Sequence, residues 1–174
     1  MILIVIMAII GPMISNYDYE TNDLMNTNMP PSSEHWFGTD DLGRDVFVRT
    51  WMGARISLTV GLAAAAIDLM IGVIYGGIMG YFGGRVDEFM NKFAEILYSI
   101  PYMLVTILLL VVFEPSIGTI ILALTITGWI NMSWIVRGEI MQLKNREYVL
   151  ASRSMGAGSG RLLFRHLLPN AVGP

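Results

Sequence analysis

Long apolar stretches that are almost free of charge constrain this chain more than any other feature. Residues 56–84 carry Asp68 as their only charged side chain, and residues 96–113 and 115–136 carry none. Each stretch is close to, or longer than, the roughly 20 residues that a helix needs to cross the hydrocarbon core. Because backbone polar groups in lipid must be satisfied within their own segment, we expect these stretches to be helices. The predicted fold class is an all-α membrane protein, a multi-span helical bundle.

The composition agrees with this class and excludes several functions. Hydrophobic residues make up 54% of the 174 positions and charged residues only 14%, against about 25% charged in soluble domains. The chain has no cysteine, which excludes disulfides, thiolate metal sites and a thiol nucleophile. The net charge of −3 gives no basic field for nucleic acid.

The order of apolar and polar segments predicts the domain boundaries. Residues 1–15 are expected to form a partial first transmembrane helix; a short anchor or an unusual signal sequence is the alternative, although the basic leader and small-residue cleavage site of a signal peptide are missing. Residues 16–53 form the expected external segment. Residues 54–174 form the expected transmembrane domain, with spans at about 56–82, 94–113 and 117–136 and a cytoplasmic loop at 137–174.

The distribution of lysine and arginine predicts the orientation in the membrane. Residues 16–53 carry seven acidic residues against two arginines, whereas residues 137–174 carry six basic residues against two glutamates. Loops rich in lysine and arginine stay in the cytoplasm. We therefore expect the amino terminus, the 137–174 loop and a short loop at 85–92 inside, and the 16–53 segment and a tight turn near Glu114 outside, in a cell membrane.

A row of glycines predicts a helix-packing face on the span at 56–82. Four glycines recur every fourth residue: Gly72, Gly76, Gly80 and Gly84. Small residues at this spacing let another helix approach closely, although glycines scattered through an apolar helix are the alternative. Asp68 lies on the same row, so we expect it to face protein or the pathway rather than lipid. A proton relay would need a second ionisable group in mid-membrane, and the later spans offer none.

The external segment is rich in turns and predicts a helix from Leu42 to Trp51, capped by Thr39 or Asp40. Asp40, Asp41 and Asp45 suggest either a metal or substrate site, or caps and salt bridges to Arg44 and Arg49. The second interpretation is favoured because the spacing DDxxxD is common. The two histidines, His35 and His166, fall on opposite sides of the predicted topology. They are expected at the surface, and no metal site is predicted.

The 137–174 loop predicts two short helices. The first predicted helix covers residues 146–155 and places four side chains on one face. It is broken by Gly156, Ala157 and Gly158. The second predicted helix is capped by Ser159 and ends at Pro169. The first face comprises Tyr148, Ala151, Ser152 and Met155, and the apolar face of the second comprises Leu162, Leu163, Phe164, Leu167 and Leu168. Such a pair either docks on a partner protein or lies on the inner leaflet with Arg161 and Arg165 at the headgroups. The residues alone leave both alternatives open.

The same loop resembles the cytoplasmic motif of binding-protein-dependent importer permeases, which reads EAA, three residues, G, nine residues, I-x-L-P. Ala151, Gly156, Leu168 and Pro169 stand at matching places, whereas Leu150, Ser152 and His166 replace the motif's glutamate, alanine and isoleucine. Tyr148-Val149, the ending RHLLPN, the external string HWFGTDDLGRDVFVRTWMGARISL and the string GYFGGRVDE are similar to the C-type permease subunits of the oligopeptide, dipeptide and nickel class.

This resemblance implies a type I importer permease that transports peptides or nickel. It implies four kinds of partner: a second permease subunit, two ABC ATPases, an extracytoplasmic substrate-binding protein and membrane lipid. The chain itself would have no catalytic residue and no cofactor, because ATP and Mg²⁺ bind to the ATPases. The ATPase-coupling residues would be Tyr148, Ala151, Ser152, Gly156, Ala157, Arg161, Leu168 and Pro169. The family has six spans, so we expect this chain to be a fragment.

Three rival classes fit the residues less well. A secondary transporter predicts discontinuous helices and several mid-membrane ionisable groups, of which only Asp68 is present. A membrane-embedded enzyme needs a catalytic cluster, and none assembles in the sequence. A receptor or scaffold leaves the two-helix inner loop without a role.

Overall fold

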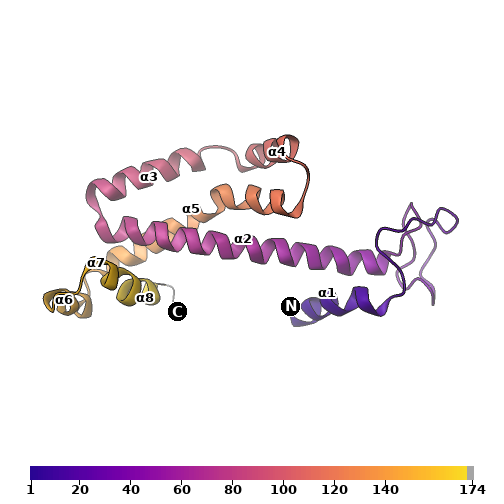
Figure 1. Cartoon of the computed structure of the whole chain (residues 1–174), viewed down its shortest axis with the longest axis horizontal. Helices are drawn as coiled ribbons and strands as arrows, with labels where there is room; N and C mark the ends of the chain where they lie inside the picture. Colours follow the sequence, from indigo (N-terminus) through magenta and orange to yellow (C-terminus); the bar gives the residue numbers. More distant parts are fainter. Residues whose placement is uncertain (172–174) are drawn as a thin grey trace. The chain divides into compact units, whose positions relative to one another are not determined.

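Helices account for all the regular secondary structure that the computed structural model describes, in residues 1–171 (Figure 1). The longer elements are α1 (Ile2–Ile14), α2 (Val46–Phe82), α3 (Gly84–Tyr98), α4 (Tyr102–Val112), α5 (Ile117–Leu143) and α6 (Glu147–Ser154). Three short elements follow: α7 (Ser159–Arg161), the π-helix η1 (Leu162–Leu167) and α8 (Leu168–Ala171). The all-α fold class is confirmed. The chain divides into two compact units, residues 1–62 and 63–174, and α2 runs through both.

In the first unit, α1 packs against the beginning of α2. Pro12 lies inside α1 and has no N–H, so the carbonyl of Ala8 loses its usual partner four residues later. Arg55 of α2 replaces that partner: its Nε donates to the Ala8 carbonyl over 2.9 Å, and its Nη2 donates to the Ile9 carbonyl over 2.7 Å. An arginine thus satisfies the Ala8 carbonyl that the proline leaves unpaired.

The external segment connects α1 to α2 and is held by the acidic residues at its end. Asp45 Oδ1 accepts a hydrogen bond from the backbone N–H of Val48 over 2.9 Å, so Asp45 caps α2. The prediction of a separate helix beginning at Leu42 with Thr39 or Asp40 as cap is therefore wrong, and α2 begins ten residues before the predicted span at 56.

Asp40 organises the turn before α2. It forms ion pairs with Arg44 at 2.9 Å and with Arg49 at 3.3 Å, which confirms the predicted salt bridges. Burial alone would raise the pKa of Asp40. The hydrogen bonds that it accepts from Arg44 and Leu42 outweigh burial and lower the pKa below its ordinary value.

His35 is buried, so the prediction of a surface histidine is wrong at this position. Its Nδ1 lies 2.8 Å from Asp45 Oδ2, and its ring lies against the ring of Tyr17 with centroids 4.4 Å apart. The polar partner and the aromatic contact together offset the cost of removing the imidazole from water. His166 of the inner loop is half-buried.

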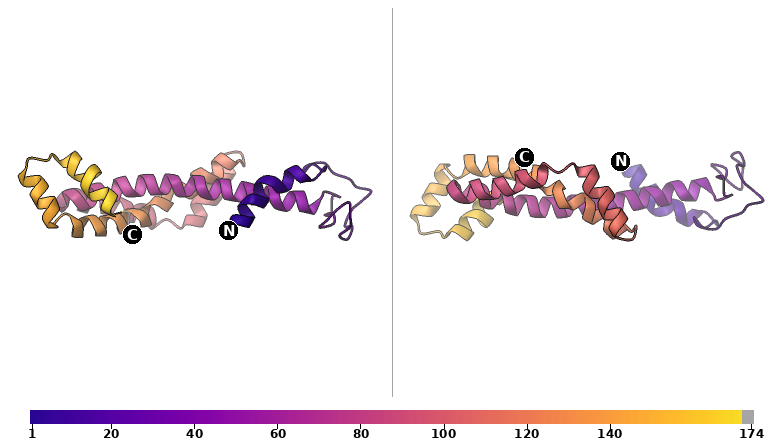
Figure 2. Two further views of the ribbon diagram at one scale, coloured as in Figure 1. Left: turned by 90° about the horizontal axis from the view of Figure 1, so that it is seen from below. Right: turned by 90° about the horizontal axis from the view of Figure 1, so that it is seen from above.

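In the second unit, the later part of α2 is accompanied by α3 and α5 (Figure 2). The predicted span at 94–113 is not one helix. Residues 84–98 are already helical as α3, so the expected loop at 85–92 does not exist, and α3 and α4 meet at a 69° bend. The chain breaks there because Pro101 has no N–H to continue the helix.

The last predicted span, α5, is longer than expected. Ser116 caps its start, with Oγ accepting from the N–H of Thr119 over 3.1 Å, and the helix continues past residue 136 to Leu143. Two helices, α2 and α5, are each long and apolar enough to cross a membrane, and the bent pair α3–α4 together forms a third candidate. The structure is thus that of a multi-pass membrane protein.

Candidate functional site

The inner loop forms a two-helix element after α5. Its first helix, α6, ends at Ser154, and Gly156 then reverses the chain with a φ of +85°, a conformation that favours glycine. The predicted break at 156–158 is therefore present. The second helix begins at Ser159 without a side-chain cap, so the prediction that Ser159 caps it is wrong.

The second helix widens into a π-helix and continues past Pro169 to Ala171, so the prediction that Pro169 ends it is also wrong. In the π-helix the backbone bonds reach five residues back: the N–H of Leu168 donates to the carbonyl of Leu163. Pro169 then lies in the first turn of α8, where a missing N–H costs little. Residues 172–174, the end of the predicted loop, lie outside the described residues.

The apolar face of the second helix is buried inside the protein. The core of this region comprises Val136, Ile140, Val149, Leu162, Leu163, Leu167 and Leu168. Half-buried residues of α2, among them Val73, Ile78 and Tyr81, pack against the same core. The leucines therefore anchor the loop to the carboxy-terminal ends of α5 and α2. A helix pair that lay on the inner leaflet would instead need this face for lipid.

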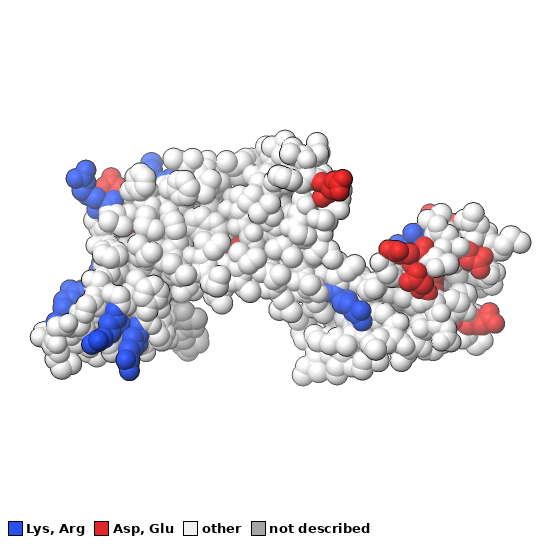
Figure 3. Space-filling model, in the orientation of Figure 1, with Lys and Arg blue, Asp and Glu red and all other residues white. Residues whose placement is uncertain are grey.

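The opposite surface of the loop remains uncovered in the described part of the chain. Four large apolar side chains are exposed there: Tyr148 (41%), Leu150 (46%), Met155 (81%) and Phe164 (58%). Basic side chains lie on the same loop in Figure 3, and Arg153, Arg161 and Arg165 are all exposed. Exposed apolar side chains on an element that also carries charged ones are typical of a surface that binds another protein.

The predicted coupling residues do not all lie on this surface. Five are exposed (Tyr148, Ala151, Gly156, Arg161 and Pro169), two are half-buried (Ser152 and Ala157), and Leu168 is buried at 8% exposure. Leu168 thus packs in the core of the loop. Phe164 is exposed, so the prediction that it belongs to the buried apolar face is wrong. The π-helix changes the spacing of side chains along the helix and turns Phe164 out of that face.

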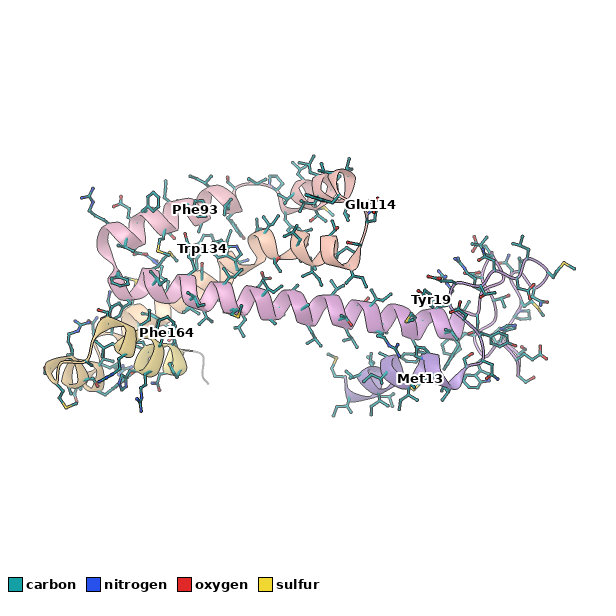
Figure 4. The ribbon with its side chains drawn as sticks, viewed as in Figure 1. Met13, Tyr19, Phe93, Glu114, Trp134 and Phe164 are labelled. Atoms are coloured by element: carbon teal, nitrogen blue, oxygen red, sulfur yellow. The ribbon has the colours of Figure 1, made fainter. Side chains whose placement is uncertain are left out.

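Polar contacts that no sequence pattern indicates connect the helices beneath the loop. Arg137 of α5 binds Asp87 of α3 through two hydrogen bonds, of which the Nη2–Oδ2 bond measures 2.6 Å. Trp134, labelled in Figure 4, donates from Nε1 to Asn91 of α3 over 2.9 Å. Lys144 donates from Nζ to the carbonyl of Gly80 over 2.9 Å. Each contact joins residues far apart in the sequence, so no local pattern indicates it.

The structure places three of the four predicted packing glycines against α5. A methyl group added at Gly72, Gly76 or Gly80 would overlap atoms of Met132, Ser133 or Ile140, respectively. Gly84 does not continue the row: α2 ends at Phe82, Gly84 has a φ of +51°, and nothing lies within 4 Å of an added methyl group.

Asp68 lies at the same contact, one turn before Gly72. Its carboxylate packs against Gly128 of α5, where a methyl group would overlap it. Its Oδ1 is buried and accepts no hydrogen bond from any residue that the structure describes. Asp68 therefore lies between helices. Among residues 1–171 no cluster of three or more metal-binding side chains occurs.

Comparison with known proteins adds sequence relationships to this geometry. Residues 72–174 match the family "Binding-protein-dependent transport system inner membrane component", and residues 1–31 match "N-terminal TM domain of oligopeptide transport permease C". The chain is 60% identical over 172 residues to the oligopeptide transport system permease protein OppC of Bacillus subtilis (strain 168), with 99% of this chain and 56% of that protein covered.

Two further relatives match the chain over the same share of its length. The dipeptide transport system permease protein DppC of Bacillus subtilis (strain 168) is 56% identical over 173 residues, covering 99% of this chain and 54% of the relative. The OppC protein of Escherichia coli (strain K12) is 39% identical over 175 residues, covering 99% of this chain and 58% of the relative. The chain thus spans just over half the length of the curated relatives that it matches.

Proposed function

Because the chain belongs to the family of binding-protein-dependent transport system inner membrane components, we propose that it forms part of the translocation pathway of an ATP-binding cassette importer for peptides. The proposed substrate is a peptide and not nickel, because the relatives named above are oligopeptide and dipeptide permeases. Its proposed partners are a second permease subunit, two ATPase subunits that bind ATP and Mg²⁺, and an external binding protein.

The observation that carries this proposal is the division of the inner loop into two opposite faces. One face buries Leu162, Leu167 and Leu168 against the membrane helices, and the other exposes Met155 and Phe164. An element that is fixed to the spans on one side and uncovered on the other can transmit a displacement from a bound protein to the spans. The ATPase pair is the partner that such importers provide on this side of the membrane.

The mechanism follows from that attachment. Closure of the ATPase pair on ATP would displace α6, and the leucine core would carry the displacement into α5 and α2. Interfaces packed at protein density are not continuously deformable, so the helices would move as units and switch the pathway between inward-open and outward-open. Exposed Arg161 and Arg165 would pair with acidic groups of the ATPase.

Cysteine crosslinking in the full-length importer tests this role. The chain has no native cysteine, so single cysteines at Ser152 and Gly158 report on their positions alone. We expect both to crosslink to the ATPase subunit, with a yield that changes when ATP is added. A cysteine at Met25 of the external segment, which is 93% exposed, is the matched control and should not crosslink. Absence of a nucleotide-dependent crosslink at both inner positions would contradict the proposal.

A further inference from the structure

The break between α3 and α4 lies beside the middle of α5. The residues of α5 that face it, Thr127, Gly128 and Asn131, occupy the centre of the predicted span at 117–136. Irregular backbone at membrane depth is tolerated where it is buried in protein or lines a water-filled cavity. The exposure of Ile100 (44%) and Tyr102 (42%) shows that, in the described part of the chain, protein does not cover this break.

A groove with a volume of about 410 Å³ lies at the break. One wall consists of Tyr98, Ile100, Pro101 and Tyr102, and the other of Thr127, Gly128 and Asn131. The groove therefore combines an interrupted helix with polar side chains of a neighbouring helix at mid-membrane depth. In secondary transporters, interrupted helices at this depth form the substrate site.

Two side chains in the groove lack hydrogen-bond partners. Thr127 is only 8% exposed, yet neither its hydroxyl nor the carboxamide of Asn131 makes a side-chain hydrogen bond to any residue in 1–171. Thr125, equally buried two residues earlier, has a hydroxyl that donates to the carbonyl of Leu122 over 3.2 Å. Asn131 is exposed at the predicted depth of the hydrocarbon, where a polar side chain against lipid is costly, so it requires protein, water or a ligand beside it.

The chemistry of the lining selects the class of ligand. No carboxylate, imidazole, amine or guanidinium is among the groove residues, so the groove offers neither a counter-charge nor a metal ligand. A carboxamide and a hydroxyl each supply both a donor and an acceptor. A peptide main chain presents the complementary set, one N–H and one C=O per residue, whatever its side chains are.

We propose that this groove is a contact site for the peptide main chain on the translocation pathway, in which Asn131 and Thr127 hydrogen-bond the passing substrate. The proposal rests on the proposed peptide transport and names its mid-membrane contact. Recognition of the main chain alone explains how one pathway accepts peptides of different sequence. Gly128 lies between the two polar residues, and a methyl group there would overlap the carboxylate of Asp68 on α2.

The first test measures peptide uptake and ATP hydrolysis by the complete importer in proteoliposomes. The double variant Thr127→Val and Asn131→Leu removes both hydrogen-bonding groups at similar volume. We expect uptake to fall about tenfold, the effect of losing two hydrogen bonds of ordinary strength, while ATP hydrolysis stimulated by the loaded binding protein continues. Thr125→Val, which removes a hydroxyl that is bonded within its own helix, should leave uptake unchanged.

A second measurement does not depend on how well that variant folds. A cysteine at Ile100, which lines the groove, should react with a bromoacetyl-labelled peptide during turnover. A cysteine at Ile107 of α4, 56% exposed and away from the groove, should not react. Unchanged uptake by the double variant, an equal loss in Thr125→Val, or no labelling at Ile100 in an importer that takes up peptide would overturn the contact site and leave the proposed function standing. An intact importer that takes up no peptide would overturn both.

Discussion

Individual glycines decide how closely α2 and α5 approach each other. At Gly76 an added methyl group would overlap the backbone of Ser133, and a backbone cannot move aside as a flexible side chain can. Gly61 lies on the same helix with nothing within 4 Å of the corresponding position. The same residue type thus has a packing role at one position and none at the other.

We predict that Gly76→Ala destabilises the protein by about 1–3 kcal/mol, the usual cost of overpacking. Gly61→Ala, the matched control, should be neutral or stabilise by up to about 1 kcal/mol, because alanine is the better helix former. Thermal unfolding of the full-length protein in detergent measures both variants. Equal melting temperatures for the two would show that the glycine face does not hold α2 against α5.

At the scale of elements, the inner ends of the helices are joined by polar contacts rather than by apolar packing alone. Asp87 is 8% exposed, and its two hydrogen bonds to Arg137 connect α3 to α5. The only comparable pair within α3, Lys92 with Glu95 at 3.1 Å, has side chains that are 73% and 46% exposed. Bidentate geometry and burial make the first pair the stronger one.

We predict that Asp87→Asn lowers stability by about 1–3 kcal/mol, because a partly buried guanidinium loses its counter-charge. Lys92→Gln should change stability by less than about 0.5 kcal/mol, the ordinary value for an exposed pair. Denaturant or thermal unfolding of the two variants under the same conditions makes the comparison. A similar small effect for both would mean that Arg137 finds another partner when Asp87 is lost.

The inner loop predicts a separation between residues that stabilise and residues that bind. Leu167→Ala should cost about 2–5 kcal/mol, because Leu167 is fully buried in the leucine core. Phe164→Ala should leave stability within about 0.5 kcal/mol, because Phe164 is 58% exposed, yet it should weaken crosslinking of the loop to the ATPase. Loss of stability in Phe164→Ala, or undiminished crosslinking, would show that Phe164 does not belong to the binding surface.

At the scale of the whole molecule, the charge distribution predicts which segments face which side. Met25 of the external segment and Met155 of the inner loop are 93% and 81% exposed, so a cysteine at either position is accessible to a reagent. In intact cells we expect a membrane-impermeant maleimide to label the cysteine at Met25 and to label the one at Met155 only after the membrane is permeabilised. Labelling of both from outside would contradict the topology.

Much of the helical content and the candidate site was predictable because the signals are local. The charge-free stretches predicted the helices at 56–82 and 117–136, and the glycines at 156–158 predicted the turn of the inner loop. The boundaries were less predictable. Asp45, rather than Thr39 or Asp40, caps α2, and which acidic residue caps a helix depends on how the preceding turn folds.

By itself, the sequence determined the class of the protein, the spans formed by α2 and α5, the glycine row from Gly72 to Gly80 and the resemblance of its inner loop, because these depend on composition and on spacing along one helix. Only the tertiary structure decided that the leucines of that loop are buried against α5 and α2, that Phe164 is exposed, that Gly84 leaves the packing row, and that the third span breaks beside Asn131. Each of these depends on contacts between residues distant in the sequence, and an amphipathic pattern does not specify which surface covers its apolar face.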